Sequence, residues 1–316
     1  MAKLSVPRSG SLQYWPRKKA RRILPRVNWG ALEDKGLLGF IGYKAGMKTA
    51  IVKDMTANSM TKDKQISVPA SIVEVPPMRI ISARFYKDKK VLKDIIFDNN
   101  KILKNKIKVS KNLGKAEDLD SAGKDADDVR IIVYSEAEKT GIKNTPDIAE
   151  IGLGGKKEEK IALVKSMIGK EIRFGDFFKA GELTDIHGVT KGKGIVGPVK
   201  RMGISLKAHK SEKGVRRPGN LAPWHPARVT FRVAQMGQMG FFTRVGYNSK
   251  IISIGKIAEK DINPGEGFKH YGKIKEEYAL IRGSIAGTEK RQIMITRPVR
   301  KTKKQEKKKF ELKEII

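Results

Sequence analysis

The sequence contains no cysteine, which excludes disulfide bonds, thiolate zinc sites and cysteine nucleophiles. Long apolar runs are also missing. The longest stretch without a charged residue, 233–243, spans 11 residues, whereas a membrane-spanning helix needs about 20 apolar residues. The basic N-terminus has no apolar segment behind its charges, so we expect neither a secretory signal nor a membrane partner.

Acidic residues are scarce, because 34 Asp and Glu stand against 67 Lys and Arg and leave a net charge of +33. So many positive charges repel one another and attract polyanions, which argues against a lone soluble enzyme. Nucleic acid is the commonest polyanionic partner of such a chain. The apolar share of 39% still allows a folded core, and the length is that of about two domains.

Residues 1–35 form a basic N-terminal arm in which Tyr14 and Trp15 lie among cations and no acid precedes Glu33. Its prolines favour an irregular backbone. A disordered solubilising tail is the alternative interpretation, but such tails are poor in aromatic residues, and this arm also carries Trp29. We therefore expect the arm to become ordered against a partner.

Short segments rich in Ile and Val, broken by Gly and Pro, predict β-strands at 37–43, 50–52, 66–75 and 78–86. Glycines inside the first segment indicate bends or close approach of another part of the chain. Strands this short, with tight connections, are typical of a small barrel or sandwich. We take residues 36–86 as the first part of this barrel or sandwich.

Residues 87–180 have mixed charge and are interpreted as an inserted α/β subdomain. Val91, Ile95 and Ile96 have helical spacing, 130–135 reads as a strand, and 158–168 fits one helix face. Strand character returns at 181–187 and at 251–296, and these two segments would complete the barrel or sandwich. A Lys-rich C-terminal tail, 297–316, follows them. The predicted fold class is mainly β, with an α+β insertion and long basic extensions.

Residues 188–250 form a long basic loop with 13 Lys or Arg and a single acid, Glu212. A structureless loop of this length indicates a function, and we expect its partner, not the free chain, to order it. Trp224 stands between prolines, far from any apolar run, which favours packing into RNA. The alternatives are a solvated basic surface and a small hydrophobic cluster under the loop.

Sites for other chemistry are weakly supported. Residues 267–273 fit the phosphate-loop pattern G-x-x-x-x-G-K, but Ile274 lacks the hydroxyl that would bind magnesium, so we predict a Gly-rich turn. The four histidines show no metal-ligand spacing. Asp185 and His187 could be drawn with any serine as a triad, which without geometry is coincidence. We expect no metal, no cofactor and no enzymatic activity.

Several motifs together resemble a large-subunit ribosomal protein of the universal L-three family, in its archaeal and eukaryotic form. The resemblance runs from end to end and is weakest across 87–160. The matching segments are Pro7–Leu12 with Pro16–Lys18, Gly42–Met47, Thr190–Gly194 with Gly197 and Lys200–Arg201, Trp224–Ala227 with Gly237, Gln238 and Gly240, Phe268–Gly272 and Gly283–Ile285.

The resemblance implies a translation-protein β-barrel that binds large-subunit rRNA and contacts neighbouring ribosomal proteins, in the cytoplasm and without homo-oligomers. It implies that the arm and the loop run deep into the rRNA, and that Trp224 is the tip of a finger. The loop would approach the peptidyl-transferase region, where RNA performs the chemistry, and the protein would support early subunit assembly. Glu212 stands where eukaryotic members often have His, so the role of that position is open here.

The residues expected to contact rRNA are cationic or aromatic, because Lys and Arg bind phosphates and rings stack on bases. They are Arg8, Tyr14, Trp15, Arg17, Lys18, Lys19, Arg21, Arg22, Lys191, Lys193, Lys200, Arg201, Lys207, Lys210, Arg216, Arg217, Trp224, His225, Arg228, Arg232 and Arg244.

Two other functions compete with this hypothesis. A free nucleic-acid chaperone or chromatin protein would use the same charge, but it would bind DNA and RNA alike. An RNA-modifying enzyme would need a cofactor pocket or a catalytic cluster, and the sequence shows neither.

Overall fold

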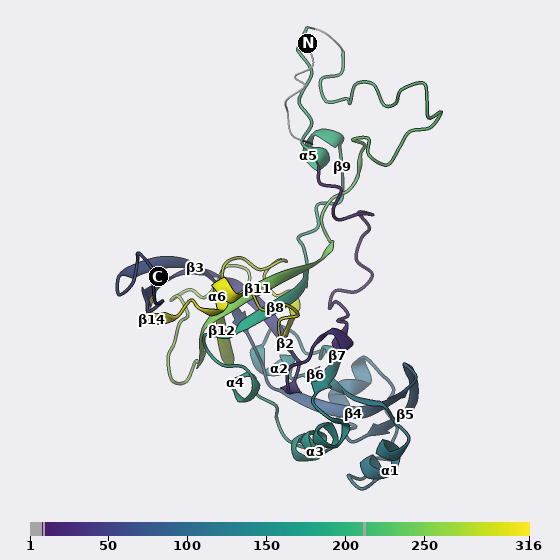
Figure 1. The fold of residues 1–316 in the computed structure, drawn as a ribbon, viewed down its shortest axis with the longest axis vertical. Helices are drawn as coiled ribbons and strands as arrows, with labels where there is room; N and C mark the ends of the chain where they lie inside the picture. Colours follow the sequence, from purple (N-terminus) through teal and green to yellow (C-terminus); the bar gives the residue numbers. More distant parts are fainter. Residues whose placement is uncertain (1–7, 9, 211–212) are drawn as a thin grey trace. The chain divides into compact units, whose positions relative to one another are not determined.

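The computed structural model describes residues 8, 10–210 and 213–316. The chain divides into two units (Figure 1). The extension unit comprises residues 1–22 and 189–243, and the core unit comprises residues 23–188 and 244–316. In the part of the chain described, none of the helices has the length and apolar character needed to cross a membrane.

The larger sheet of the core unit has seven strands in the order β13-β8-β11-β12-β3-β2-β14. An additional antiparallel pairing of β13 with β2 closes six of them into a ring, so that Met294 lies opposite both Ile41 and His187. The strands are β2 (Gly39–Asp54), β3 (Gln65–Glu74), β8 (Leu183–Val189), β11 (Thr243–Lys256), β12 (Glu277–Arg282), β13 (Gln292–Thr296) and β14 (Phe310–Ile315).

A second antiparallel sheet has five strands in the order β1-β7-β6-β4-β5, and α1 and α3 lie beside it (Figure 1). Its strands are β1 (Gly36–Leu37), β4 (Met78–Lys87), β5 (Lys90–Ile96), β6 (Asp128–Ser135) and β7 (Ile148–Gly154). The helices of the core unit are η1 (Trp29–Ala31), η2 (Lys101–Asn105), α1 (Asp118–Lys124), α2 (Ala137–Thr140), α3 (Lys157–Met167), α4 (Phe174–Phe177) and α6 (Lys303–Glu306).

One hydrophobic core joins the two sheets. Phe40 of β2 meets Phe174 edge to face at 5.2 Å between ring centroids, and Phe174 stacks on Phe178 at 4.7 Å. On the other side, Ile161 and Val164 of α3 bury the apolar face of that helix. The core is therefore shared between the two sheets, and the mainly β prediction is confirmed.

Close approach at the glycines of the first strand is confirmed, and its partner is an aromatic ring. A Cβ on Gly39 would lie 2.6 Å from the ring of Trp29, and one on Gly152 would lie 2.7 Å from the Cβ of the same tryptophan. Trp29 is buried. The predicted arm 1–35 is thus divided, because residues from Ile23 onward belong to the core unit.

Residues 39–43 and 50–52, from two predicted strands, lie in one strand, β2, of 16 residues, whereas Leu37 lies in β1. A register shift between Lys44 and Gly46 accommodates the bend that the glycines suggested. Pro69 lies inside β3. The position tolerates proline because β12 pairs with β3 only from Ala70 onward.

Residues 78–86, predicted with 36–77 as the first part of the barrel, are β4 of the five-stranded second sheet. The helical reading of 91–96 is wrong, since these residues form β5 and pair with β4. A two-residue turn joins the strands, and both of its residues, Asp88 (φ 47°) and Lys89 (φ 63°), are left-handed. Such turns usually contain glycine, and without glycine the hairpin was not recognised.

The Lys-rich tail contains α6 and the strand β14, which pairs with β2. Phe310 and Leu312 of β14 pack against the hydrophobic core. The buried ammonium of Lys250 donates hydrogen bonds to the carbonyls of Gln305 (2.9 Å), Glu306 (3.1 Å) and Lys308. These contacts hold the tail on the core unit.

A buried carboxylate, Asp147, links the two sheets. It accepts hydrogen bonds from the Tyr43 hydroxyl of β2 at 2.6 Å, from Lys106 Nζ at 3.2 Å and from Lys143 Nζ. The backbone N–H of Asp147 donates to Ser135 Oγ of β6. Burial raises the pKa of Asp147, but the bonds from Lys143 and Tyr43 outweigh it and hold the pKa below its usual range.

We predict that Asp147→Asn destabilises the free protein at pH 7 by about 1–3 kcal/mol, because it removes the buried charge that the two lysines solvate. A carboxyl with a depressed folded-state pKa stabilises above its unfolded pKa of about 4 and loses that contribution as pH falls. Urea unfolding should therefore show the wild-type advantage shrinking below pH 4. The exposed control Asp125→Asn should behave like wild type; an equal loss in both variants would contradict this role.

Candidate nucleic-acid interface

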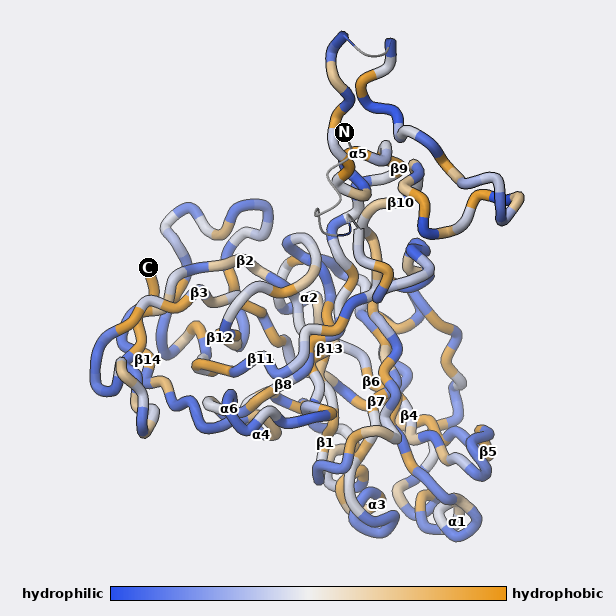
Figure 2. The backbone as a smooth tube through the Cα atoms, turned by 45° about the horizontal axis from the view of Figure 1, so that its top comes forward, coloured by the Kyte–Doolittle hydropathy of each residue, from blue (hydrophilic) through white to orange (hydrophobic). Residues whose placement is uncertain are grey.

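The described residues of the extension unit contain no Asp or Glu, whereas Lys and Arg recur throughout them. Glu212, the acid of the loop, lies outside the described residues. Figure 2 shows the same segment as a mostly hydrophilic tube with short hydrophobic stretches. Such a surface is stabilised by an external polyanion.

The loop leaves and returns through a narrow antiparallel neck. Within it, β9 (Ile195–Val196) pairs with β10 (Gly237–Gln238). Lys193 N donates to Met239 O at 2.9 Å, and Met239 N donates to Gly194 O at 2.8 Å. These hydrogen bonds hold the two ends of the long loop side by side.

Gly240 is required by this neck. Its φ of +71° is left-handed, and a Cβ there would lie 1.9 Å from the Lys191 carbonyl oxygen. Gly237 is similarly crowded, since a Cβ would lie 2.9 Å from the Arg201 guanidinium carbon. At these two positions glycine lets one segment of the chain pack closely against another.

A short helix, α5 (Pro198–Met202), follows the first side of the neck. Pro198 begins it, and Gly203 (φ +73°) ends it in the left-handed conformation. Arg201, predicted to contact RNA, donates to the backbone oxygens of Gln238 (3.1 Å) and Gln235 (3.0 Å). This side chain braces the neck from within.

The N-terminal arm lies against the loop, although the two are far apart in sequence. Ala20 N donates to Phe241 O at 2.8 Å, and the rings of Trp15 and Phe231 lie 5.2 Å apart. Arg17 Nη1 lies 2.6 Å from the sulfur of Met202, which is buried. Arm and loop therefore form one basic surface.

The arm residue Arg8 donates from Nη2 to the Arg232 carbonyl at 2.7 Å. Lys19 lies 5.6 Å from the ring centroid of Phe241. Part of the predicted cation set thus also holds the extension unit together.

The far part of the loop has almost no core of its own. Among the described residues of 190–243, only Met202 and Gly240 are buried, and Trp224 is 89% exposed. Beside Trp224, an open hollow of about 670 Å³ is lined by Pro223, Pro226, Arg228, Val229, Thr230, Phe231 and Arg232. Cations around an aromatic and proline floor suit an unstacked base with its phosphate.

Most other predicted contacts lie on this surface as exposed side chains. They are Tyr14, Lys18, Arg21, Arg22, Lys191, Lys193, Lys200, Lys210, Arg216, Arg217 and His225. Lys207 is half-buried, and its N–H donates to Val215 O. Arg244 is the exception, because it lies in β11 and belongs to the core unit.

Three residues of this surface were not predicted: Met202, Phe231 and Phe241. Each is an apolar residue in a segment dense in cations and glycine. Since such a segment cannot build a core, its few apolar residues were available for contacts between the arm and the loop. That scarcity was the signal that could have identified them.

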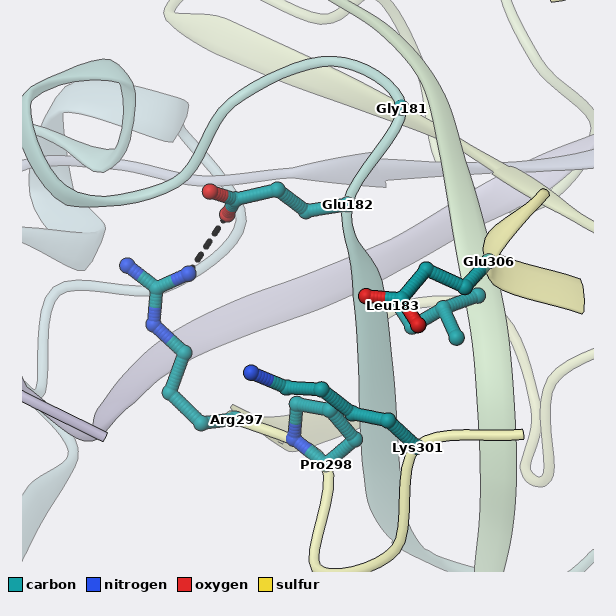
Figure 3. A pocket seen from close by; sticks show the side chains of 7 residues that line it. All are labelled: Gly181, Glu182, Leu183, Arg297, Pro298, Lys301 and Glu306. Carbon is teal, nitrogen blue, oxygen red and sulfur yellow. Dashed lines mark hydrogen bonds and ion pairs between the residues drawn. The ribbon is translucent and has the colours of Figure 1, made fainter. Parts of the chain in front are cut away.

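Figure 3 shows a hollow of about 260 Å³ in the core unit, lined in part by Glu182, Arg297 and Lys301. Arg297 Nη1 pairs with Glu182 Oε2 at 2.5 Å, and Lys301 pairs with Asp34 at 2.7 Å. The guanidinium of Arg297 also lies 4.6 Å from the Phe178 ring. The cations of this hollow serve packing of the core unit.

The other alternative sites are structural. Asp185 accepts from the backbone N–H groups of Asn248 and Val299, and His187 Nε2 lies 3.2 Å from Thr296 Oγ1. Residues 267–273 contain the predicted Gly-rich turn, closed by Phe268 N donating to Gly272 O at 2.8 Å. Across residues 8, 10–210 and 213–316, no three acidic or histidine side chains gather as metal ligands would.

The family model described as ribosomal protein L3 matches residues 1–97 and 81–315 of the chain. The large ribosomal subunit protein uL3 of Methanosphaera stadtmanae is 39% identical over 320 residues, covering 96% of this chain and 95% of the relative. The protein of the same name from Archaeoglobus fulgidus is 39% identical over 308 residues, covering 94% and 93%. That of Methanothrix thermoacetophila is 38% identical over 313 residues, covering 95% and 93%.

We predict that Gly240→Ala opens the neck, because the new methyl group would collide with the Lys191 carbonyl in a backbone conformation that alanine rarely adopts. Limited trypsin digestion of the free protein should cleave after Lys191 and Lys193 several-fold faster. Gly219→Ala is the matched control, since nothing lies within 4 Å of a Cβ there. Equal cleavage of both variants would show that Gly240 has no special role.

Proposed function

Because the chain belongs to the ribosomal protein L3 family, we propose that its extension unit binds large-subunit rRNA in the assembled particle. As a member of this family, the chain is a non-enzymatic structural component of the large ribosomal subunit. Its partners are accordingly rRNA and other ribosomal proteins. We propose in addition that the individual arm and loop residues named above contact the rRNA.

The observation that carries this proposal is the joined surface of arm and loop, whose described residues include no Asp or Glu. Packed RNA helices repel one another through their phosphates, and a protein segment between them must supply cations without carboxylates. A segment with two buried residues among those described in 190–243 cannot fold by burying its own surface. Its partner must supply the burial, and RNA supplies both burial and opposite charge.

The finer placement rests on the sequence resemblance. We propose that the loop reaches toward the peptidyl-transferase region with Trp224 at its tip, where an 89% exposed ring can pack on RNA. We also propose that the closed ring of six strands is the translation-protein β-barrel, which anchors the chain on rRNA and supports early assembly. The chemistry of peptide transfer would remain with the RNA.

Sedimentation of a native lysate tests the proposal directly. The chain should travel with the large subunit at one copy per particle and stay with it through a high-salt wash, because buried aromatic contacts resist salt better than charge alone. Loss into the wash, or distribution over both RNA and DNA fractions, would instead favour the nucleic-acid chaperone.

Binding of the full chain to naked large-subunit rRNA separates the roles of charge and stacking. With about ten phosphate contacts, the log–log salt slope should be roughly −7 to −9. Arg216→Gln with Arg217→Gln should reduce its magnitude by roughly 1.4–1.8, whereas Trp224→Ala should weaken binding by about 1–3 kcal/mol at unchanged slope.

The charge control for this binding assay is Lys111→Gln with Lys115→Gln. These two exposed lysines lie in the mixed-charge part of the core unit. The control pair should change neither slope nor affinity. If it lowers the slope as much as the arginine pair does, the charge acts without regard to position and the proposed interface is wrong.

A further inference from the structure

A second cationic surface lies in the core unit, away from the arm and the loop in sequence. The β2–β3 loop and the C-terminal segment meet there, as β14 pairs with the end of β2 (Figure 1). Met55 N donates to Lys309 O at 2.9 Å, and Lys309 N donates to Thr56 Oγ1 at 3.1 Å. We call residues 53–64 and 303–313 together the loop–tail surface.

Met60 at the tip of this surface is 97% exposed, more than any other large apolar side chain in the described residues. Met55 in the same loop is 44% exposed. A single exposed apolar residue is ordinary. A nearly fully exposed methionine is informative when the loop that carries it has a fixed conformation, and this loop does.

The carboxylate of Asp54, at the end of β2, holds the loop in one conformation. This carboxylate accepts hydrogen bonds from Thr56 N (2.9 Å), Ser59 Oγ (2.9 Å) and Thr61 Oγ1 (2.6 Å). Asp63 N also donates to Asp54 O at 2.8 Å. The bonds from Thr56 and Thr61 hold the pKa of Asp54 well below its usual range, so the carboxylate stays charged at neutral pH.

The backbone of the loop uses the left-handed conformation at Asn58 and Asp63, both at φ 61°. Asn and Asp tolerate that conformation better than other residues with a side chain. Met60 is therefore held outward by a preformed turn. A preformed turn loses little conformational entropy when its tip binds a partner.

The charge around the tip is positive. The loop–tail surface has nine lysines against four acids, and the side chains of three of these acids are engaged within the chain. Asp63 pairs with Lys53 at 3.3 Å, Glu311 pairs with Lys313 at 2.7 Å, and Asp54 holds the loop. What faces outward is a set of exposed lysines: Lys62, Lys64, Lys303, Lys304, Lys307 and Lys309.

Repulsion among these cations is only partly offset inside the protein, where Asp54 acts to raise the pKa of Lys308. Lys308 lies near Arg282 and Lys304, and burial together with those two charges lowers the pKa of Lys308. An external polyanion would relieve that repulsion. This second observation agrees with the excess of positive charge.

From the exposed Met60 on a fixed loop and the lysines around it, we propose that the loop–tail surface is a second rRNA-binding site of this chain. Met60 packs between or against bases as an apolar wedge, and the lysines bind the adjoining phosphates. The proposal rests on the proposed ribosomal function but is independent of the extension unit. An acidic protein is the other partner of matching charge, and the experiment distinguishes it.

Directed hydroxyl-radical cleavage tests the site in intact large subunits. Because the chain has no cysteine, Met60→Cys creates a single attachment point for an iron chelate. Leu113→Cys is the matched control, since Leu113 is also exposed (47%) but lies in the mixed-charge part of the core unit. Trp224→Cys reports separately on the extension unit.

The expected result is strand cleavage of rRNA at a few discrete nucleotides from position 60 and none at those nucleotides from position 113. Cleavage from position 224 but not from position 60 would overturn this inference and leave the proposed function intact. Cleavage from neither 60 nor 224 would sink both. Cutting of a neighbouring protein from position 60 would assign the surface to a protein partner.

Affinity for naked large-subunit rRNA provides a second readout with the full chain. Met60→Ser should weaken binding several-fold at unchanged salt slope, and Lys62→Gln with Lys64→Gln should reduce the slope by about 0.9 for each phosphate that the variant no longer neutralises. Neither variant alters the Asp54 hydrogen bonds, so thermal unfolding should match wild type. Wild-type binding by both variants would overturn the proposal.

Discussion

Repulsion between like charges is the constraint on which this structure depends. The described extension unit has many cations and no carboxylate, so folding cannot neutralise it, and it buries almost nothing of its own. The extension unit is distinct from the core unit, which contains a conventional hydrophobic core. The core unit folds by burying Ile, Val and aromatic side chains between two sheets, and the extension unit keeps its charge for an outside partner.

The few apolar residues of the extension unit have a distinct use. Trp15, Met202 and Phe231 connect the arm to the loop, and Gly240 lets the two sides of the neck approach. Backbone bonds and a handful of side-chain interactions therefore bring segments about 200 residues apart to one surface. With so little internal packing, the sum of phosphate interactions can dominate the energy of binding.

Polar groups buried in the core unit join its segments. Asp147 links β2 to the second sheet, Lys250 holds the tail, and Asp54 shapes a loop. Each of these groups has several partners, which is what burial of a charge requires. The tail is therefore part of the core unit despite its composition, and its lysines are placed beside the β2–β3 loop.

Charge segregation and short Ile- and Val-rich segments were enough to predict a mainly β chain with RNA-binding extensions, because composition and local period are properties of sequence. They could not show that residues 78–96 belong to the second sheet, since a hairpin turn through Asp88 and Lys89 lacks the usual glycine. Nor could they show that Trp29 is buried, that Arg201 braces the neck or that Met60 is exposed. Those outcomes depend on contacts between distant segments, which only the tertiary structure decides.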